Sequence, residues 1–136
     1  MRLLPLLLAL LLPLGCAHAP LSIAPGREIA GTLAKGDSKL ESGELCDVYT
    51  FDAAAGTNVS VRLESEHFDC YLILIEPDGT QQDNDDFAGE TNSQIDRTLT
   101  STGAVQAIVT TYRGGESGDY TFSLMTSRPV RVAPSS

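Results

Sequence analysis

Residues Phe68 to Ser93 read FDCYLILIEPDGTQQDNDDFAGETNS, and this stretch decides the fold of the chain. It contains an apolar run, Leu72 to Ile75, in which successive side chains alternate between two faces and both faces are apolar. Such a run predicts a central β-strand that is covered on each side. Pro77 and Gly79 then predict a turn, because proline presets φ and glycine tolerates a positive φ.

Oxygen-bearing side chains gather directly after this turn, and no Lys or Arg lies among them. The candidate metal ligands are Asp83, Asn84, Asp85, Asp86 and Glu90. Hard cations such as Ca²⁺ bind six to eight oxygen atoms from carboxylates, amides, carbonyls and water, so the segment predicts a calcium site. The alternative is a solvated turn in which Asp and Asn side chains hydrogen-bond to their own backbone.

Short runs that alternate apolar and polar residues recur on both sides of this stretch and end at Gly, Asp, Asn or Ser. The predicted strands are Arg27–Leu33, Leu45–Asp52, Asn58–Leu63, Cys70–Glu76, Gln94–Thr100, Val105–Tyr112 and Asp119–Met125. No segment has helical periodicity. About seven to eight short strands without crossover helices predict an all-β fold, an antiparallel β-sandwich.

The two-residue period of a strand assigns the core faces. The side chains expected inside are Leu45, Tyr49, Phe51, Val59, Val61, Leu63, Tyr120, Phe122 and Leu124. Asp47 falls on the same face as Tyr49 and Phe51. Because a buried carboxylate must be paired or hydrogen-bonded, we expect Asp47 to have a structural role.

The N-terminal leucine-rich run, Leu3 to Leu14, follows Arg2 and predicts an export signal. It is shorter than the roughly 20 residues that a membrane-spanning helix needs. Two cleavage sites compete. A lipoprotein-type signal would be cut before Cys16, which would then be acylated and would anchor the protein to a membrane; ordinary export would cut after Ala19.

Either cleavage predicts an exported protein, a periplasmic or cell-surface lipoprotein or otherwise a secreted one. The expected organisation is a signal peptide over residues 1–19, one domain over 20–128 and a tail over 129–136. In an oxidising compartment Cys46 and Cys70 can form a disulfide; the alternative is that both are small buried apolar residues.

The charge of the chain excludes one class of partner. Lys and Arg number 9 against 18 Asp and Glu, which gives a formal net charge of −9. Since nucleic-acid binding requires a positive surface, we expect no nucleic-acid partner.

Catalytic motifs are missing from the sequence. Beyond the signal region His67 is the one histidine, and Gly115-Glu116-Ser117-Gly118 lacks the spacing of a nucleophile elbow. Paired cysteine or histidine signatures for zinc and a glycine-rich phosphate loop are likewise missing. We therefore expect a protein that is not an enzyme.

Ten short motifs occur in a fixed order along the domain: Gly31-Thr32-Leu33, Gly36-Asp37, Ser42-Gly43-Glu44, Asp47 to Phe51, Ala55-Gly56, Phe68 to Leu72, Pro77-Asp78-Gly79, Asn84-Asp85-Asp86, Asn92-Ser93 and Gly118-Asp119-Tyr120. In order and spacing they resemble the bacterial and archaeal pre-peptidase C-terminal domain, which is related to the collagen-binding domains of collagenases. The resemblance implies a jelly-roll-like β-sandwich that is non-catalytic and is usually appended to a secreted peptidase.

The resemblance also bears on calcium. Collagenase-type relatives are associated with calcium, partly through an acidic linker ahead of the sandwich. Here residues Pro20 to Ile29 contain Glu28 as the one acid, so that linker site is not carried over. Any calcium would be held by Asp83 to Asp86 with Glu90.

These observations together predict an exported accessory module that contacts a protein or polysaccharide of the envelope or the extracellular space. The alternative function is a calcium-stabilised secretion chaperone, or a partner of a secreted peptidase that acts in trans.

Overall fold

The computed structural model describes residues 16, 20–36, 38–84 and 91–128, and the statements below concern this part of the chain. Its strands are β1 (Leu21–Ser22), β2 (Arg27–Leu33), β3 (Cys46–Ala53), β4 (Asn58–Glu64), β5 (Cys70–Ile75), β6 (Gln81–Asn84), β7 (Ser93–Thr98), β8 (Gly103–Thr111) and β9 (Gly118–Ser127).

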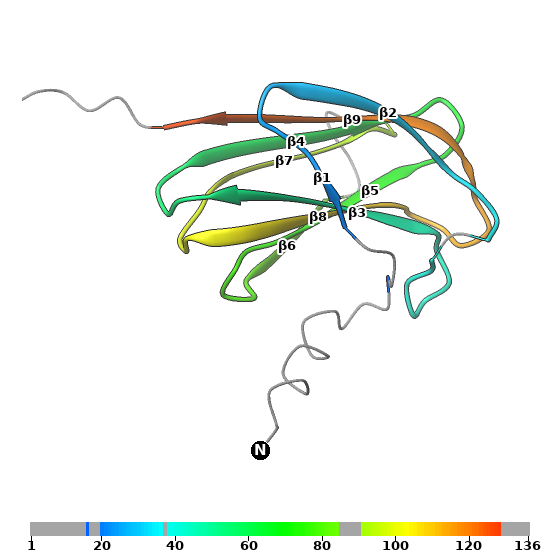
Figure 1. The fold of residues 1–136 in the computed structure, drawn as a ribbon. Helices are drawn as coiled ribbons and strands as arrows, with labels where there is room; N and C mark the ends of the chain where they lie inside the picture. Colours follow the sequence, from blue (N-terminus) through cyan, green and yellow to red (C-terminus); the bar gives the residue numbers. More distant parts are fainter. Residues whose placement is uncertain (1–15, 17–19, 37, 85–90, 129–136) are drawn as a thin grey trace, which may run out of the picture.

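Two sheets pack face to face in the described part of the chain (Figure 1). One has the strand order β1-β3-β8-β5-β6 and the other the order β2-β9-β4-β7. The pairings are antiparallel, apart from the short parallel pairing of β1 with β3. The predicted all-β sandwich is confirmed.

The main core lies between the sheets and is built from one face of β2, β3, β4, β5, β7, β8 and β9. Every residue that the alternation assigned to it is buried, and the Tyr49 and Phe122 rings stack with centroids 4.7 Å apart. The predicted central strand β5 lies between β8 and β6. Its Leu72 and Leu74 side chains belong to the main core, whereas Ile73 belongs to a smaller cluster on the outer face of its sheet.

A polar network crosses this core where Asp47 was expected to need a partner. The Tyr120 hydroxyl donates a hydrogen bond of 2.7 Å to Oδ2 of Asp47. Because that bond uses the one hydroxyl proton of Tyr120, the Tyr49 hydroxyl is the donor in the 2.6 Å bond between the two tyrosines. Gly31, opposite Tyr120 in the register, leaves room for the ring: a Cβ there would lie 2.5 Å from the Tyr120 Cζ atom.

The structure adds two strands that the sequence pattern did not predict, β1 and β6. Strand β6, with the sequence QQDN, pairs with β5 so that Asp83 is opposite Ile73. It lies at the edge of its sheet and its residues are exposed or half-buried, so it lacks the apolar alternation on which the strand prediction depends. The first residues of the predicted acidic loop are therefore part of the sheet.

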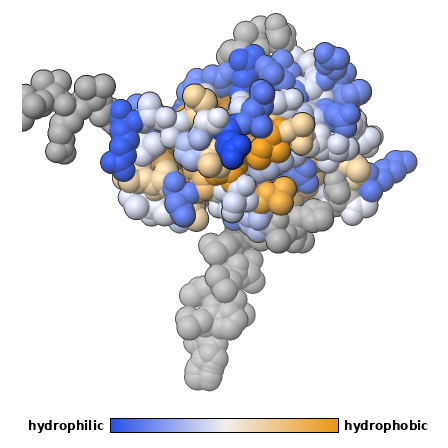
Figure 2. Space-filling model, turned by 45° about the horizontal axis from the view of Figure 1, so that its top comes forward, coloured by the Kyte–Doolittle hydropathy of each residue, from blue (hydrophilic) through white to orange (hydrophobic). Residues whose placement is uncertain are grey.

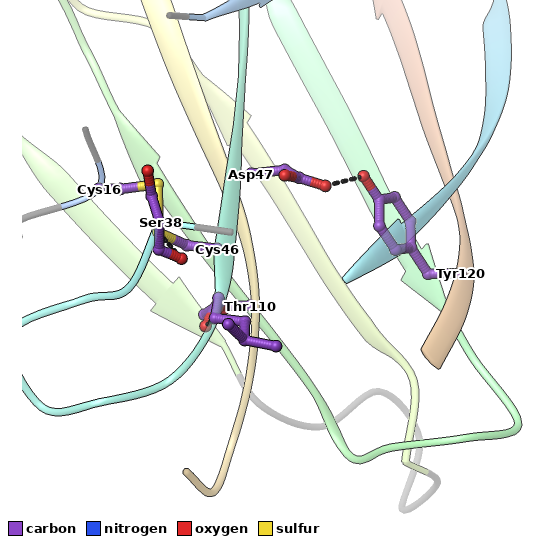
Figure 3. Close-up of a disulfide and its surroundings, with 7 residues drawn as sticks. Cys16, Ser38, Cys46, Asp47, Thr110 and Tyr120 are labelled. Atoms are coloured by element: carbon purple, nitrogen blue, oxygen red, sulfur yellow. Dashed lines mark hydrogen bonds between the residues drawn. A yellow bond between two sulfur atoms is a disulfide. The ribbon is translucent and has the colours of Figure 1, made fainter. Parts of the chain in front are cut away.

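The predicted disulfide between Cys46 and Cys70 is wrong. Cys46 is bonded to Cys16 and Cys70 is a free, buried cysteine. The reason is strand geometry: Cys70 lies in the main core, whereas Cys46 lies with the outer cluster on the opposite face of the same sheet. Figure 3 shows Cys46 and its neighbour Asp47 pointing to opposite sides of β3.

The disulfide and the predicted lipidation of Cys16 are mutually exclusive. An acyl anchor and a disulfide both need the same Sγ atom, and in the structure that atom is bonded to Cys46. The described residues contain no helix that could span a membrane.

Candidate functional site

The predicted metal ligands are divided by the boundary of the described residues. Asp85, Asp86 and Glu90 lie outside it, so their arrangement stays a prediction. Asp83 accepts hydrogen bonds from the Tyr71 hydroxyl at 3.0 Å and from the Gln81 amide at 3.1 Å. In the described part of the chain no group of three or more His, Cys, Asp or Glu residues is arranged to hold a metal ion. Calcium binding remains a prediction.

Asn84 ties β6 to the opposite sheet. Its side-chain amide donates to the backbone carbonyl of Gln94 at 2.5 Å, and its backbone carbonyl accepts a hydrogen bond from the Ser93 hydroxyl. Both partners belong to β7, so this edge of the sandwich is closed by specific hydrogen bonds. Asn84 thus has a structural role in the described residues.

Asp83 lines a hollow of about 440 Å³ on the outer face of the sheet that contains β5. We call it the tyrosine hollow. It is lined by Leu40, Glu41, Ser42, Glu44, Tyr71, Ile73, Gln81, Asp83, Thr111 and Tyr112. Leu40 and Ile73 belong to the outer apolar cluster, so the hollow lies against a packed surface. The other residues come from the segment between β2 and β3, from β5, from β6, and from the end of β8 with the residue that follows it.

Two tyrosine rings give this hollow its apolar surface. Tyr71 projects from β5 and Tyr112 follows directly after β8, and their ring centroids are 6.3 Å apart at an interplanar angle of 53°. Tyr112 is 50% exposed, whereas Tyr71 is half-buried and is held by its bond to Asp83. Exposed aromatic rings of this kind offer a large contact area with a polar hydroxyl, which suits a binding surface.

Three of the residues that line the tyrosine hollow are acidic. Glu41, Glu44 and Asp83 contribute three carboxylates, and the lining contains no Lys or Arg. The Arg113 guanidinium lies next to the hollow, 5.8 Å from the centroid of the Tyr112 ring. A cation can therefore rest on that ring, as expected from the negative face of an aromatic side chain. The hollow suits a partner that brings apolar groups and positive charge together.

A larger groove of about 870 Å³ lies at one end of the sandwich and includes His67. Two of its hydroxyl groups are already paired: the Ser65 hydroxyl donates to the Asp119 carbonyl at 2.7 Å, and the Thr32 hydroxyl donates to the Asp119 carboxylate at 2.7 Å. The Ser65 oxygen accepts the backbone N–H of His67, not a proton from its ring. Among the described residues this groove thus contains no serine–histidine pair of the kind that hydrolases use.

Cys70 does not supply a nucleophile either. Burial, and next the nearby Asp69 carboxylate, raise the pKa of its thiol to about 12. A thiol with that pKa stays protonated at neutral pH, and the thiolate is the reactive form. The free cysteine is therefore a core residue.

The outer face of the other sheet has a mixed surface. Figure 2 shows this face, on the side of β2 and β9, as a mixture of hydrophilic and hydrophobic residues. Leu21, Tyr112 and Met125 are the large apolar side chains most exposed in the described part of the chain. Of these, Tyr112 has an aromatic neighbour in a hollow, which makes the tyrosine hollow the best candidate site.

Fold and surface together define the class of protein: a small all-β sandwich that presents a hollow with aromatic and acidic side chains. No protein-family model and no curated protein matches the sequence. Solved structures do match. The pre-peptidase C-terminal domain of collagenase from Bacillus anthracis has a TM-score of 0.60 and 21% sequence identity, over 78% of this chain and 94% of that one.

Two further matches are the periplasmic inhibitors of g-type lysozyme, PliG, from Aeromonas hydrophila and Salmonella Typhimurium. Their TM-scores are 0.59 and 0.58, with 15% and 16% identity. The matches cover 79% and 81% of this chain, and 96% and 100% of the inhibitors. The predicted resemblance to the pre-peptidase C-terminal domain is thereby confirmed at the level of the fold.

Proposed function

We propose that this chain is an exported, non-catalytic binding module that holds a protein of the envelope or the extracellular space in the tyrosine hollow. One observation carries the proposal: Tyr71 and Tyr112 lie side by side in a hollow that also contains three carboxylates. Tyrosines in a desolvated pocket are typical anchors of protein interfaces, and a polar rim fixes the orientation of the partner.

The solved structures support a binding role for this fold. One match is a domain of a collagenase, and two are inhibitors of g-type lysozyme, so the same fold binds a protein in the periplasm. The low sequence identity transfers the fold alone, and the identity of the partner has to come from experiment. A g-type lysozyme is a reasonable first protein to test.

The negative charge of the chain favours a partner with a positively charged surface. The chain has a net charge of −9, and the hollow contains Glu41, Glu44 and Asp83. A partner with Lys or Arg side chains on its surface would be attracted to this region and oriented by it. Because exposed charges are screened by salt, we expect the affinity to fall as ionic strength rises.

A photocrosslinking experiment in exporting cells tests the proposal. A benzoylphenylalanine residue replaces Tyr112 in one variant and Met125 in a matched variant. Both positions are exposed, by 50% and 58%, but Met125 lies on β9 in the other sheet. We expect one defined protein to be crosslinked from position 112 and not from position 125, and the crosslink to weaken when Glu44→Lys is added.

Other results of the photocrosslinking experiment would assign the hollow to a different ligand or remove it as a binding site. A crosslink from position 112 to glycan instead of protein would assign the hollow to a polysaccharide. Equal products from both positions, or no product from position 112, would remove the tyrosine hollow as the binding site.

The alternative function is a secretion chaperone or a partner of a secreted peptidase that acts in trans. The fold likeness to a pre-peptidase C-terminal domain favours it. In the same experiment this alternative predicts that the crosslinked protein is a secreted peptidase.

A further inference from the structure

Cys16 lies apart from the sheets in sequence but is built into the domain. The side chain is 1% exposed and its partner Cys46 is fully buried. Their Cα atoms are 6.1 Å apart, which lies within the usual range for a disulfide. Figure 3 shows the two sulfur atoms on the outer side of β3, facing away from the Asp47–Tyr120 bond.

The surroundings of this disulfide are apolar. Cys16 and Cys46 form one cluster with Leu40, Val48, Ile73 and Ile108. This cluster covers the outer face of the sheet, a face that would otherwise expose apolar side chains to water. Cys16 therefore contributes to packing as well as to the covalent link.

A second attachment lies a few residues further along the chain. Strand β1 pairs in parallel with β3, with Leu21 opposite Tyr49. The Ile23 amide donates to the Thr50 carbonyl at 3.0 Å, and the Ile23 side chain is buried in the main core. The N-terminal part of the domain is thus joined to β3 both covalently and by backbone hydrogen bonds.

We propose that Cys16 is retained in the exported protein as the disulfide partner of Cys46 and is not an acylation site. Acylation would require the sulfur atom that the disulfide uses. Cleavage after Ala19 would discard Cys16 and leave Cys46 without its partner. The signal is therefore removed on the N-terminal side of Cys16, and this attachment to β3 takes the place of a lipid anchor at that residue.

The bond forms by thiol–disulfide exchange with a disulfide-bonded oxidoreductase of the exported compartment. One cysteine thiolate attacks the disulfide of the oxidoreductase and forms a mixed disulfide, releasing one thiolate of the oxidoreductase. The second cysteine thiolate then displaces the other sulfur. The two cysteines lose two electrons and two protons, and the oxidoreductase leaves as a dithiol.

Mass spectrometry of the full chain, exported with its own signal, tests the proposal. The protein is denatured and treated with a thiol-alkylating reagent, once without and once after reduction. We expect a mature chain that contains Cys16 without an acyl group. One cysteine, Cys70, should be alkylated without reduction and all three after it.

Matched variants identify the bond. In Cys46→Ser, Cys16 should become alkylated without reduction, whereas Cys70→Ser should leave the Cys16–Cys46 bond intact. If Cys46→Ser is not recovered, a peptide map of the unreduced wild type must contain the Cys16 peptide joined to the Cys46 peptide. An acyl group on Cys16, a chain that begins at Pro20, or a disulfide to Cys70 would each overturn the proposal.

Discussion

The hydrogen-bond network in the core predicts different effects for two similar substitutions, Tyr120→Phe and Tyr49→Phe. The Tyr120 hydroxyl donates to the Asp47 carboxylate and accepts from Tyr49, so it has two partners inside the sandwich. Tyr49→Phe removes one neutral hydrogen bond and leaves the Tyr120–Asp47 bond in place. Both variants keep the ring and therefore most of the apolar packing.

The expected magnitudes follow from these partners. A hydrogen bond to a charged group contributes about 1.5–3 kcal/mol and a neutral one about 1 kcal/mol. Tyr120→Phe should lower the free energy of unfolding by about 3 kcal/mol, because it removes both bonds and leaves a carboxylate and a hydroxyl with fewer partners. Tyr49→Phe should lower it by about 1 kcal/mol.

Urea unfolding followed by circular dichroism measures both values. The m-value should be the same in the wild type and the two variants, since the surface exposed on unfolding does not change. Equal losses in the two variants, or a loss below about 1 kcal/mol in Tyr120→Phe, would refute the central role assigned to the Tyr120 hydroxyl.

Three further predictions concern pH, the disulfide and calcium. Burial opposes ionisation of Glu76, but the Thr100 amide and then Arg97 outweigh it and lower the pKa of the carboxyl. The stability that ionised Glu76 contributes is therefore present above the unfolded pKa of about 4.3 and is lost as the pH falls through the lower folded pKa. Glu76→Gln should lower the free energy of unfolding by about 2–3 kcal/mol at pH 7. If urea unfolding shows that this difference persists in strong acid, the role given to the Glu76 carboxylate is contradicted. Cys46→Ser removes a disulfide that links residues 30 positions apart and should lower the free energy of unfolding by about 3–4 kcal/mol. Reduced wild type should unfold at the same urea concentration as this variant. A variant as stable as the oxidised wild type would argue against the bond. If calcium binds with a dissociation constant of about 1 mM, 10 mM calcium should stabilise the fold by about 1.4 kcal/mol relative to chelator, and an unchanged melting temperature would exclude such a site.

Much of the fold follows from the period-two pattern, and the exceptions have physical reasons. In β9, Tyr120 and Phe122 alternate with exposed or half-buried residues, so their burial is clear from sequence. In β6 the residues on both faces are exposed or half-buried, so the sequence has no alternation of apolar and polar residues that would predict a strand. An edge strand of this kind is specified by its pairing with β5, which is a tertiary contact.

The cysteine pairing illustrates the same limit. The run around Leu72 is apolar on both faces, so the sequence does not reveal which face of β5 belongs to the main core. Once Cys70 is known to share the inner face with Leu72, a bond to Cys46 on the outer face is ruled out. The partner Cys16 lies in the predicted signal region, where it is expected to be acylated or cleaved off, so the sequence did not indicate it as a disulfide partner.

The candidate site was found only in part. Asp83 was identified for its carboxylate, and it does line the hollow. Tyr71 and Tyr112 lie far apart in sequence and meet because β5 pairs with β8 in a register that places Tyr71 opposite Thr110. The sequence shows that both tyrosines belong to the chain's few aromatic residues, but the contact between their rings depends on this register.

Calorimetric titration with the purified protein that is crosslinked from position 112 measures whether the tyrosine hollow is the binding site. The variants are Tyr112→Ala and, as the matched control, Met125→Ala on the other sheet. Tyr112→Ala should weaken binding about tenfold or more, with an unchanged melting temperature, while Met125→Ala should bind like the wild type. Wild-type affinity in Tyr112→Ala would contradict the claim that the tyrosine hollow is the binding site.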